Sequence, residues 1–335
     1  MNIGILGDGG WGTALALVLH RNGHRVRIWG PFPDYVHEVA TRRENPKFLP
    51  GVALPPDLLW TSDRELAVAG ADSIVLAVPS RFYGRVASDF APFLPPQALL
   101  ISVSKGLDQE TRLRLTEIAE RRLGRGPVAA LSGPSHAEEV ARGIPTAVVA
   151  ACPDHEVAAA VQRLFNNSAF RVYTSEDIVG VELGGALKNV IALAAGISDG
   201  IGYGDNTKAA LITRGLAEMT RLGVARGARA ETFAGLSGIG DLIVTCTSRL
   251  SRNRAVGERL GRGEPLSSIL TGMEQVAEGI WTCRAAWELA QEMGVETPII
   301  EQVVAVVHDR RDPREAVHAL MSRPPRRESE NFGVG

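Results

Sequence analysis

The sequence predicts an α/β protein in which a doubly wound, mostly parallel β-sheet is followed by an all-α domain. Three observations support this prediction. Apolar runs typical of strands alternate with helical patterns through the first half, a glycine-rich turn follows the first run, and strand patterns stop after about residue 175. The 335 residues allow two domains, which we expect at 1–177 and 178–323, with a disordered tail at 324–335.

Composition excludes several classes of protein. The formal net charge is -2 and the basic residues are dispersed, so nucleic acid is not expected as a partner. No stretch approaches 18 uninterrupted apolar residues, and the opening strand leaves no room for a signal peptide. The three cysteines form no CxxC pair, which fits a reducing compartment. We therefore expect a cytoplasmic protein without a membrane span.

Metal and serine-nucleophile chemistry have no support in the sequence. The 7 histidines show no spacing typical of metal ligands, and neither HExxH nor G-x-S-x-G occurs.

The first turn has the pattern of a dinucleotide-binding site. An apolar strand at 2–6 runs into Gly7-Asp8-Gly9-Gly10-Trp11-Gly12, and a helix at about 13–22 and a strand at 25–29 follow. In such a G-x-G-x-x-G turn, Gly7 makes the tight bend, Gly9 lets the backbone approach a pyrophosphate, and Gly12 lets the helix lie close to the strand. The helix N-terminus then faces the phosphates. These features predict a Rossmann-like domain.

The choice between NAD and NADP stays open. After the second strand, an acidic residue usually binds the ribose of NAD, whereas an arginine usually accompanies NADP. This chain has Gly30-Pro31-Phe32 there and carries neither signal. Asp8 places a carboxylate in the phosphate loop, so its side chain is expected to point away or to be offset.

Further strands are expected at 73–78, 99–103, 128–131, 146–151 and 170–173, with helices at 112–122 and 154–165 among them. Ligands of such sheets bind beyond the carboxyl ends of the strands. Lys105 follows one of these strands, although an ordinary surface lysine is an equal alternative. Ser135 follows another, and its spacing from Glu138 is that of a capping box, which would explain the serine by capping alone.

The second half is expected to be helical, over 178–197, 207–223, 252–260, 280–293, 299–308 and 314–321. The chain is organised around the first of these helices, which has a single cation, Lys188, among apolar residues. Gly184 and Gly185 lie one turn away, so a ligand could approach the ammonium closely. Close helix packing is the alternative reason for the glycines, but a packing face does not favour a central lysine.

Two other features of the second half suggest a site. Ser251 is a good N-cap, which places Arg252 in the first helical turn, where the helix dipole disfavours cations unless an anion binds. We expect Arg252 and Asn253 to bind a phosphate or carboxylate, the alternative being an arginine-rich surface. Asp241 lies in a glycine-bounded turn, and the apolar residues that follow should carry it inward.

With these residues in place, the chain resembles the bacterial NAD(P)-dependent glycerol-3-phosphate dehydrogenases from residue 1 to about 323. The resemblance is carried by long segments in the family's order: GDGGWGTALA, RRENPKFLPG, AVPS, SVSKGL, LSGPSHAEEVARG, ELGGALKNVIALAAGISDGIGYGDNTKAALITRGL, GLSGIGDLIVTC, SRNR and VAEGI.

The resemblance implies reversible reduction of dihydroxyacetone phosphate to sn-glycerol 3-phosphate with NAD or NADP, supplying phospholipid synthesis. It assigns proton transfer to Lys188, with Lys105 and Asp241 as further catalytic residues. Substrate contacts are implied for Lys105, Gly133, Ser135, Lys188, Asp241, Ser251, Arg252 and Asn253. Cofactor contacts are implied for Gly7, Gly9, Gly10, Trp11, Gly12, Lys105, Ala137, Arg252, Val276 and Glu278. The chain departs from the family at Gly10, commonly Ser, and His136, commonly Phe, and it lacks the arginine expected for NADPH.

This assignment makes Lys188 the general acid for the ketone oxygen, so its pKa should be lowered by burial and by Lys105. Asp241 would orient the ammonium or a substrate hydroxyl. Two alternatives remain: a related hydroxy-acid dehydrogenase in which Arg252 binds a carboxylate, and a non-catalytic dinucleotide sensor. The sequence leaves the oligomeric state open, a homodimer included.

Overall fold

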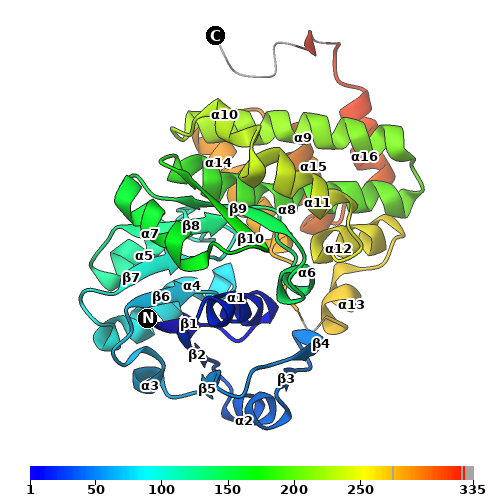
Figure 1. The fold of residues 1–335 in the computed structure, drawn as a ribbon. Helices are drawn as coiled ribbons and strands as arrows, with labels where there is room; N and C mark the ends of the chain where they lie inside the picture. The colour runs from blue at the N-terminus through cyan, green and yellow to red at the C-terminus, as the bar shows by residue number, and fades with distance from the viewer. Residues whose placement is uncertain (274, 326, 329–335) are drawn as a thin grey trace. The chain divides into compact units, whose positions relative to one another are not determined.

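A computed structural model describes residues 1–273, 275–325 and 327–328, and its path is shown in Figure 1. The chain forms two compact units. The first comprises Met1–Ser104 and Leu115–Ile178, and the second comprises Lys105–Arg114 and the chain from Val179 onward. Most of the expected tail at 324–335 lies outside the described residues.

The segment Lys105–Arg114 differs from the expected division, which placed it in the N-terminal domain. Its charged side chains explain why it groups with the second unit. Arg112 pairs with Glu292 at 2.7 Å, and Arg114 pairs with Glu182. Ion pairs between residues this far apart in the chain cannot be predicted from local sequence patterns.

The first unit is built on an eight-stranded sheet with the order β10-β9-β8-β7-β6-β1-β2-β5. All neighbours are parallel except β8 and β9, which are antiparallel. The expected strands are present with ends moved by at most two residues, while β5 and a small hairpin of β3 and β4 were not expected. The bounds are β1 Asn2–Leu6, β2 Arg25–Trp29, β3 Glu44–Asn45, β4 Leu49–Ala53, β5 Leu59–Thr61, β6 Ser73–Leu76, β7 Leu99–Ser102, β8 Val128–Ser132, β9 Thr146–Ala151 and β10 Phe170–Ser175.

Helices cover both faces of this sheet, as a doubly wound fold requires. The alternation along β1 shows it: Ile3 and Ile5 belong to the core that includes α1, whereas a side chain at Gly4 would meet the backbone of α3. Each central strand therefore buries apolar side chains on both of its faces. The helices are α1 Gly10–Arg21, α2 Pro33–Arg42, α3 Arg64–Val68, α4 Ser80–Phe90, α5 Leu115–Leu123, α6 Ala137–Ala141 and α7 His155–Phe165, with a 3₁₀ turn at Ala91–Phe93.

The order of the strands reverses between β1 and β6. From β1 the chain proceeds outward through β2 to β5, and then returns to β6 and proceeds through β7 and β8 the other way. Ligands of doubly wound sheets bind beyond the carboxyl ends of the strands at such a switch point. The glycine-rich turn follows β1 directly, so the fold places it at the expected binding position.

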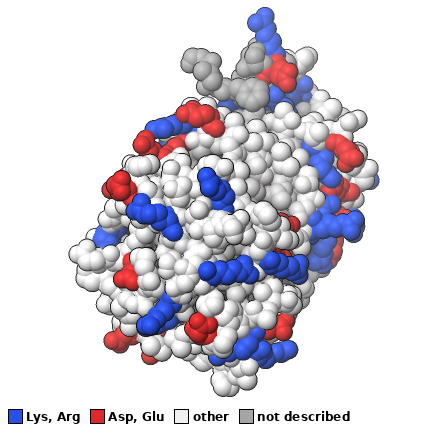
Figure 2. Space-filling model, viewed as in Figure 1, with Lys and Arg blue, Asp and Glu red and all other residues white. Residues whose placement is uncertain are grey.

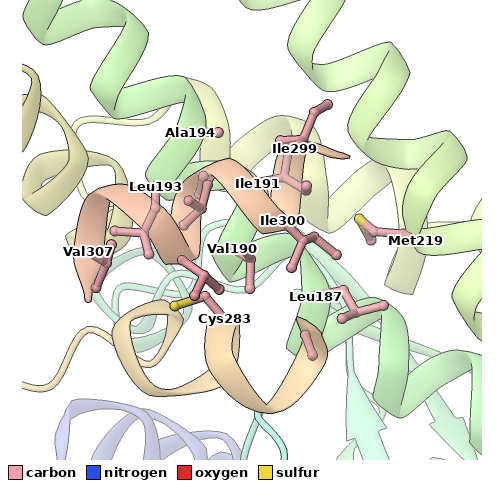
Figure 3. Close-up of a cluster of buried hydrophobic side chains, with 14 of the residues drawn as sticks. Leu187, Val190, Ile191, Leu193, Ala194, Met219, Cys283, Ile299, Ile300 and Val307 are labelled. Atoms are coloured by element: carbon pink, nitrogen blue, oxygen red, sulfur yellow. The ribbon is translucent and has the colours of Figure 1, made fainter. Parts of the chain in front are cut away.

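The second unit is helical, as predicted, and α8 Ile178–Ile201 is buried at its centre. Figure 3 shows apolar side chains of α8, α9, α14 and α15 gathered in one core, with Leu187, Val190 and Ile191 of α8 among them. The expected helices are all present; the short α10, α11 and α13 were not predicted. The bounds are α9 Asp205–Ala225, α10 Ala230–Phe233, α11 Asp241–Thr247, α12 Arg252–Gly261, α13 Leu266–Thr271, α14 Gly279–Glu292, α15 Pro298–Val307 and α16 Pro313–Met321, with a π-helical turn at Leu236–Gly240.

Glycines let α8 and α12 approach closely. A Cβ at Gly196 of α8 would lie 2.0 Å from the carbonyl oxygen of Arg254, and one at Gly257 of α12 would lie 2.2 Å from that of Leu193. Gly200 and Gly261 repeat the arrangement one turn further on. The two helices therefore pack backbone to backbone, which fixes the position of the residues at the start of α12 against α8.

Among the described residues, α8 is the one helix that is long and apolar enough to cross a membrane. Its apolar window is 94% buried inside the protein, as in the core helix of a soluble protein. On the face drawn in Figure 2, acidic and basic side chains are interspersed, in keeping with the dispersed charges of the sequence.

Candidate functional site

The turn after β1 has the geometry that its glycines predict. Gly7 has φ +125°, which favours glycine, and a Cβ at Gly12 would lie 2.3 Å from the carbonyl oxygen of Gly7. Helix α1 begins at Gly10, three residues earlier than expected, so its first amides belong to the turn itself. A Cβ at Gly9 would meet no atom within 4 Å. The open space at Gly9, beside the positive end of α1, fits a pyrophosphate.

Cofactor contacts are also implied for Gly10 and Trp11 of this turn and for Ala137, which lies beside it. The indole N–H of Trp11 donates to the carbonyl oxygen of Val103 at the end of β7, at 3.2 Å. A Cβ at Gly10 would lie 3.7 Å from the Cβ of Ala137, the first residue of α6. It would also lie 2.5 Å from the carbonyl oxygen of Phe48, so a serine at position 10, common in the family, has no room here.

Gly133 and Ser135 follow β8, and the predicted capping box is absent. The hydroxyl of Ser135 donates to the carbonyl oxygen of Gly133 at 2.9 Å, and the N-cap of α6 is His136 rather than Ser135. Helix α6 starts one residue later than the capping box requires, so Glu138 lies in its first turn without the reciprocal bond. The serine is therefore not explained by capping.

The cationic centre of the second unit is a cluster of two lysines and one aspartate, in which Lys188 and Asp241 are buried and Lys105 is half-buried. The ammonium group of Lys188 donates to Oδ1 of Asp241 at 2.7 Å and to Oγ1 of Thr245 at 2.7 Å. Lys105 donates to the other oxygen, Oδ2 of Asp241, also at 2.7 Å. Because one carboxylate faces two ammonium groups, the cluster keeps an excess positive charge. Such a charge favours an anionic ligand or a developing negative charge on an oxygen.

The pKa values of this cluster follow from burial and charge. Burial lowers the pKa of Lys188 to about 8; Asp241 opposes this change and Lys105 adds to it. Burial alone would raise the pKa of the Asp241 carboxyl, but the ammonium groups of Lys105 and Lys188 outweigh it and lower that pKa. The direction for Lys188 and both of its causes are those that the sequence analysis expected. At neutral pH the lysine is therefore protonated but close to its titration point.

Thr245 was missed in the sequence. It lies four residues after Asp241 on α11, so the two side chains share one helix face. Its hydroxyl donates to the carbonyl oxygen of Asp241 at 2.6 Å and so can accept from Lys188. The sequence predicts a glycine-bounded turn at Asp241 and no helix after it; recognising that helix would have revealed the pair.

The expectation for the Gly184-Gly185 pair needs a correction. A Cβ at Gly184 would lie 2.4 Å from the carbonyl oxygen of Ser237, so this glycine admits the turn that precedes α11 rather than a ligand. This close approach brings Asp241 to the helix that carries Lys188.

The start of α12 is built partly as expected. Ser251 is the N-cap and accepts from the amide of Arg254 at 3.2 Å. The charge of Arg254 is neutralised by an ion pair between its Nε and Oδ2 of Asp199, at 2.9 Å. Arg254 therefore does not require an external anion. Arg252 is exposed at the first helical position.

Both ends of the amide of Asn253, which is predicted to bind a phosphate, have partners in the protein. Nδ2 donates to Oδ1 of Asn189 at 2.9 Å, and Oδ1 accepts from the amide of Gly279 at 2.8 Å. Asn253 therefore joins the residue after Lys188 to the start of α14. Glu278 directly precedes that helix start and Val276 lies two residues further back.

Among the described residues no group of three or more His, Cys, Asp or Glu side chains could hold a metal ion. The arrangement instead offers acid–base chemistry at Lys188 and binding of an anion nearby. The structure brings Lys105 and Lys188 onto the two carboxylate oxygens of Asp241, while Gly10 lies beside Ala137 in the first unit.

Comparison with known proteins gives consistent matches along the chain. Residues 2–158 match the model of the NAD-dependent glycerol-3-phosphate dehydrogenase N-terminus, and residues 177–318 match that of the C-terminus. The chain is 52% identical to glycerol-3-phosphate dehydrogenase [NAD(P)+] of Syntrophotalea carbinolica, over 96% of this chain and 98% of the relative. It is 50% identical to that of Geobacillus kaustophilus, over 99% and 97%. The solved glycerol-3-phosphate dehydrogenase of Coxiella burnetii superposes with a TM-score of 0.93 at 40% identity, over 96% and 99%.

Proposed function

The chain belongs to the NAD(P)-dependent glycerol-3-phosphate dehydrogenase family, and on that premise we propose that Lys188 transfers the proton in its reaction. The protein is thus an oxidoreductase that interconverts dihydroxyacetone phosphate and sn-glycerol 3-phosphate with NAD(P) as cofactor. The observation that carries the role of Lys188 is its ammonium group, buried against Asp241 and Thr245.

The first unit would hold the dinucleotide through the turn Gly7–Gly12, with the amides at the start of α1 toward the pyrophosphate. Gly9 leaves space for that approach, and Trp11 and Ala137 would line it. When bound, the nicotinamide supplies and accepts the hydride.

Lys188 would then act as general acid during reduction. Two of its three N–H donors are occupied by Asp241 and Thr245, and the third has no partner in the described part of the chain. That donor can pass a proton to the C2 oxygen of the ketone as negative charge develops there. In the oxidation direction, the neutral amine takes the proton back. A pKa of about 8 allows both directions near neutral pH.

Lys105 and Asp241 would support this step. Asp241 holds the ammonium of Lys188 in place through Oδ1, while Lys105 binds Oδ2 of the same carboxylate. The excess positive charge of the three groups stabilises the developing alkoxide. Ser251 and Arg252 would hold the phosphate at the start of α12, with Gly133 and Ser135 as further substrate contacts. Asn253 would act mainly by positioning Asn189 and α14, where Val276 and Glu278 lie near the cofactor in this proposal.

The test is a comparison of substrates at the nicotinamide absorbance band. The purified protein should oxidise NADH or NADPH with dihydroxyacetone phosphate, and far more slowly with the unphosphorylated ketone dihydroxyacetone or with pyruvate. A preference for the carboxylated ketone would contradict the proposed substrate. Binding of dinucleotide without oxidation by any of the three would contradict an enzymatic role.

We also place this reaction in the cytoplasm, where glycerol 3-phosphate would supply phospholipid synthesis. All three cysteines are buried and free, which supports a reducing compartment. Expression of the chain should restore growth of a bacterium that depends on added glycerol 3-phosphate. A variant without Lys188 should not restore it.

A further inference from the structure

The end of β2 lacks a residue of its own to recognise the adenosine ribose. Gly30-Pro31-Phe32 provides neither the acidic side chain that usually binds the 2′-hydroxyl of NAD nor an arginine for the 2′-phosphate of NADP. Proteins of this fold nevertheless need some group at this place if they are to distinguish the two cofactors.

Asp8 brings a carboxylate to this place from the glycine-rich turn. A Cβ built at Gly30 would lie 2.2 Å from Oδ2 of Asp8, so the carboxylate fills the space that a side chain at position 30 would take. The neighbouring backbones explain the proximity, because the amide of Gly7 donates to the carbonyl oxygen of Trp29 at 3.0 Å. The sequence predicts that the Asp8 side chain points away from the phosphates or is offset, and its position at the end of β2 is consistent with that prediction.

The carboxylate of Asp8 is buried and incompletely bonded. The residue is only 7% exposed, and among the residues that the structure describes Oδ2 has no hydrogen-bond partner. Burial raises the pKa of Asp8 to about 6, while its own backbone amide and the charge of Lys47 oppose that rise. A buried carboxylate oxygen is costly unless a donor completes it, so an unbonded one next to a ligand site indicates a missing donor.

We propose that Asp8 is the specificity-determining residue for the cofactor, accepting a hydrogen bond from the ribose 2′-hydroxyl of NAD(H) and excluding the 2′-phosphate of NADP(H). This inference rests on the proposed dinucleotide site. The hydroxyl is the donor that Oδ2 lacks, whereas a phosphate brings up to two negative charges against a buried carboxylate. The chain should therefore prefer NADH.

Two neighbouring charged residues offer competing explanations. Lys47 follows the hairpin residue Asn45, whose side-chain amide donates to the carbonyl oxygen of Asp8 at 2.8 Å. An ammonium so near could attract a 2′-phosphate. Asp34, at the exposed start of α2, is the next acidic residue after Gly30 and could bind the ribose in place of Asp8.

The experiment measures the dissociation constants of NADH and NADPH by fluorescence titration, independently of turnover. The wild-type protein should bind NADH at least about tenfold more tightly than NADPH. Asp8→Asn keeps the shape and removes the charge, and it should reduce this ratio by about tenfold or more. Asp34→Asn, the matched removal of a nearby charge, and Lys47→Ala should leave NADH preferred.

Each result has one consequence. The proposal is overturned if the ratio of the NADPH and NADH dissociation constants in Asp8→Asn stays within twofold of the wild-type value. It is also overturned if the preference for NADH is lost in Asp34→Asn instead. Asp8→Ala provides a second variant if Asp8→Asn does not fold; if neither folds, the wild-type ratio decides, because a preference for NADPH contradicts the role of Asp8. Failure of the wild-type protein to bind either dinucleotide would instead contradict the proposed function.

Discussion

The glycine turn of the first unit and the lysine cluster of the second unit provide function in opposite ways. At the turn, the absence of side chains is what matters: Gly9 leaves space and Gly12 lets α1 lie against Gly7. In the cluster, three charged side chains from Lys105, Lys188 and Asp241 meet across long stretches of chain. The first depends on local backbone geometry, and the second depends on how distant helices pack.

This difference predicts where a mutation acts. A change in the turn should affect binding and local packing, whereas a change in the cluster should alter acidity and turnover. The predictions that follow test this separation, beginning with the largest expected effect.

Replacing Asp241 by asparagine should reduce kcat by about 10²-fold or more, because it removes the carboxylate that holds Lys188. The same carboxylate raises the pKa of Lys188, so its loss should lower that pKa further. Since reduction of the ketone requires the protonated lysine, the decline of kcat at high pH should shift to lower pH. The measurement is the pH profile of kcat.

Asp199→Asn is the matched control, because Asp199 also contacts two cations, Lys208 at 2.8 Å and Arg254 at 2.9 Å. It should leave the pH profile unchanged. An equal shift in both variants would mean that loss of a buried charge, and not contact with Lys188, changes the profile.

Replacing Gly257 by alanine should lower the free energy of unfolding by about 2–3 kcal/mol, since the new methyl group would press on the backbone of α8. Gly272→Ala is the control, because its Cβ would lie 3.9 Å from its nearest neighbour. Denaturant titration measures both. Equal stability of the two variants would show that α8 and α12 do not pack as closely as described.

Replacing Gly9 by alanine should weaken NADH binding by about tenfold while the melting temperature changes little, because the new methyl group meets only open space in the protein. Gly12→Ala should lower the melting temperature as well, since its methyl group would collide with the oxygen of Gly7. If Gly9→Ala bound NADH normally, the pyrophosphate would not lie at this glycine.

Replacing Thr245 by valine should reduce kcat by a smaller factor, about three- to tenfold, since Lys188 keeps Asp241 and loses one hydrogen bond. The affinity for NADH should not change. A loss as large as that of Asp241→Asn would show that the hydroxyl takes part directly in proton transfer.

The sequence predicted the fold class, the glycine turn and most of the helices, because each depends on local periodicity or on a short motif. The individual residues Lys188, Asp241 and Lys105 were also selected. Their mutual contacts, however, join positions up to 136 residues apart, and no spacing rule specifies such contacts. The sequence patterns explained each of these residues only from its immediate neighbours. The family resemblance indicated that the three residues belong to one site.

The remaining misses have two physical causes. Thr245 and α11 were hidden in a segment rich in glycine, and Ser135 was explained by a cap that α6 does not form. Gly184 was interpreted as part of a helix face open to a ligand, whereas the turn at Ser237 occupies the space beside this glycine. Thr245 and Ser135 depend on where a short helix begins. Gly184 depends on a backbone from elsewhere in the chain, which a local window of sequence does not contain.

The most direct test of the account is the turnover of Lys188→Ala with dihydroxyacetone phosphate and NADH, measured together with NADH affinity. Loss of the proton donor should reduce kcat by about 10³-fold or more and leave the dissociation constant of NADH within about twofold of the wild-type value. Lys208→Ala, which removes a lysine paired with Asp199 in the same unit, should retain normal turnover. Near-normal turnover of Lys188→Ala would contradict the assignment of Lys188 as the proton donor.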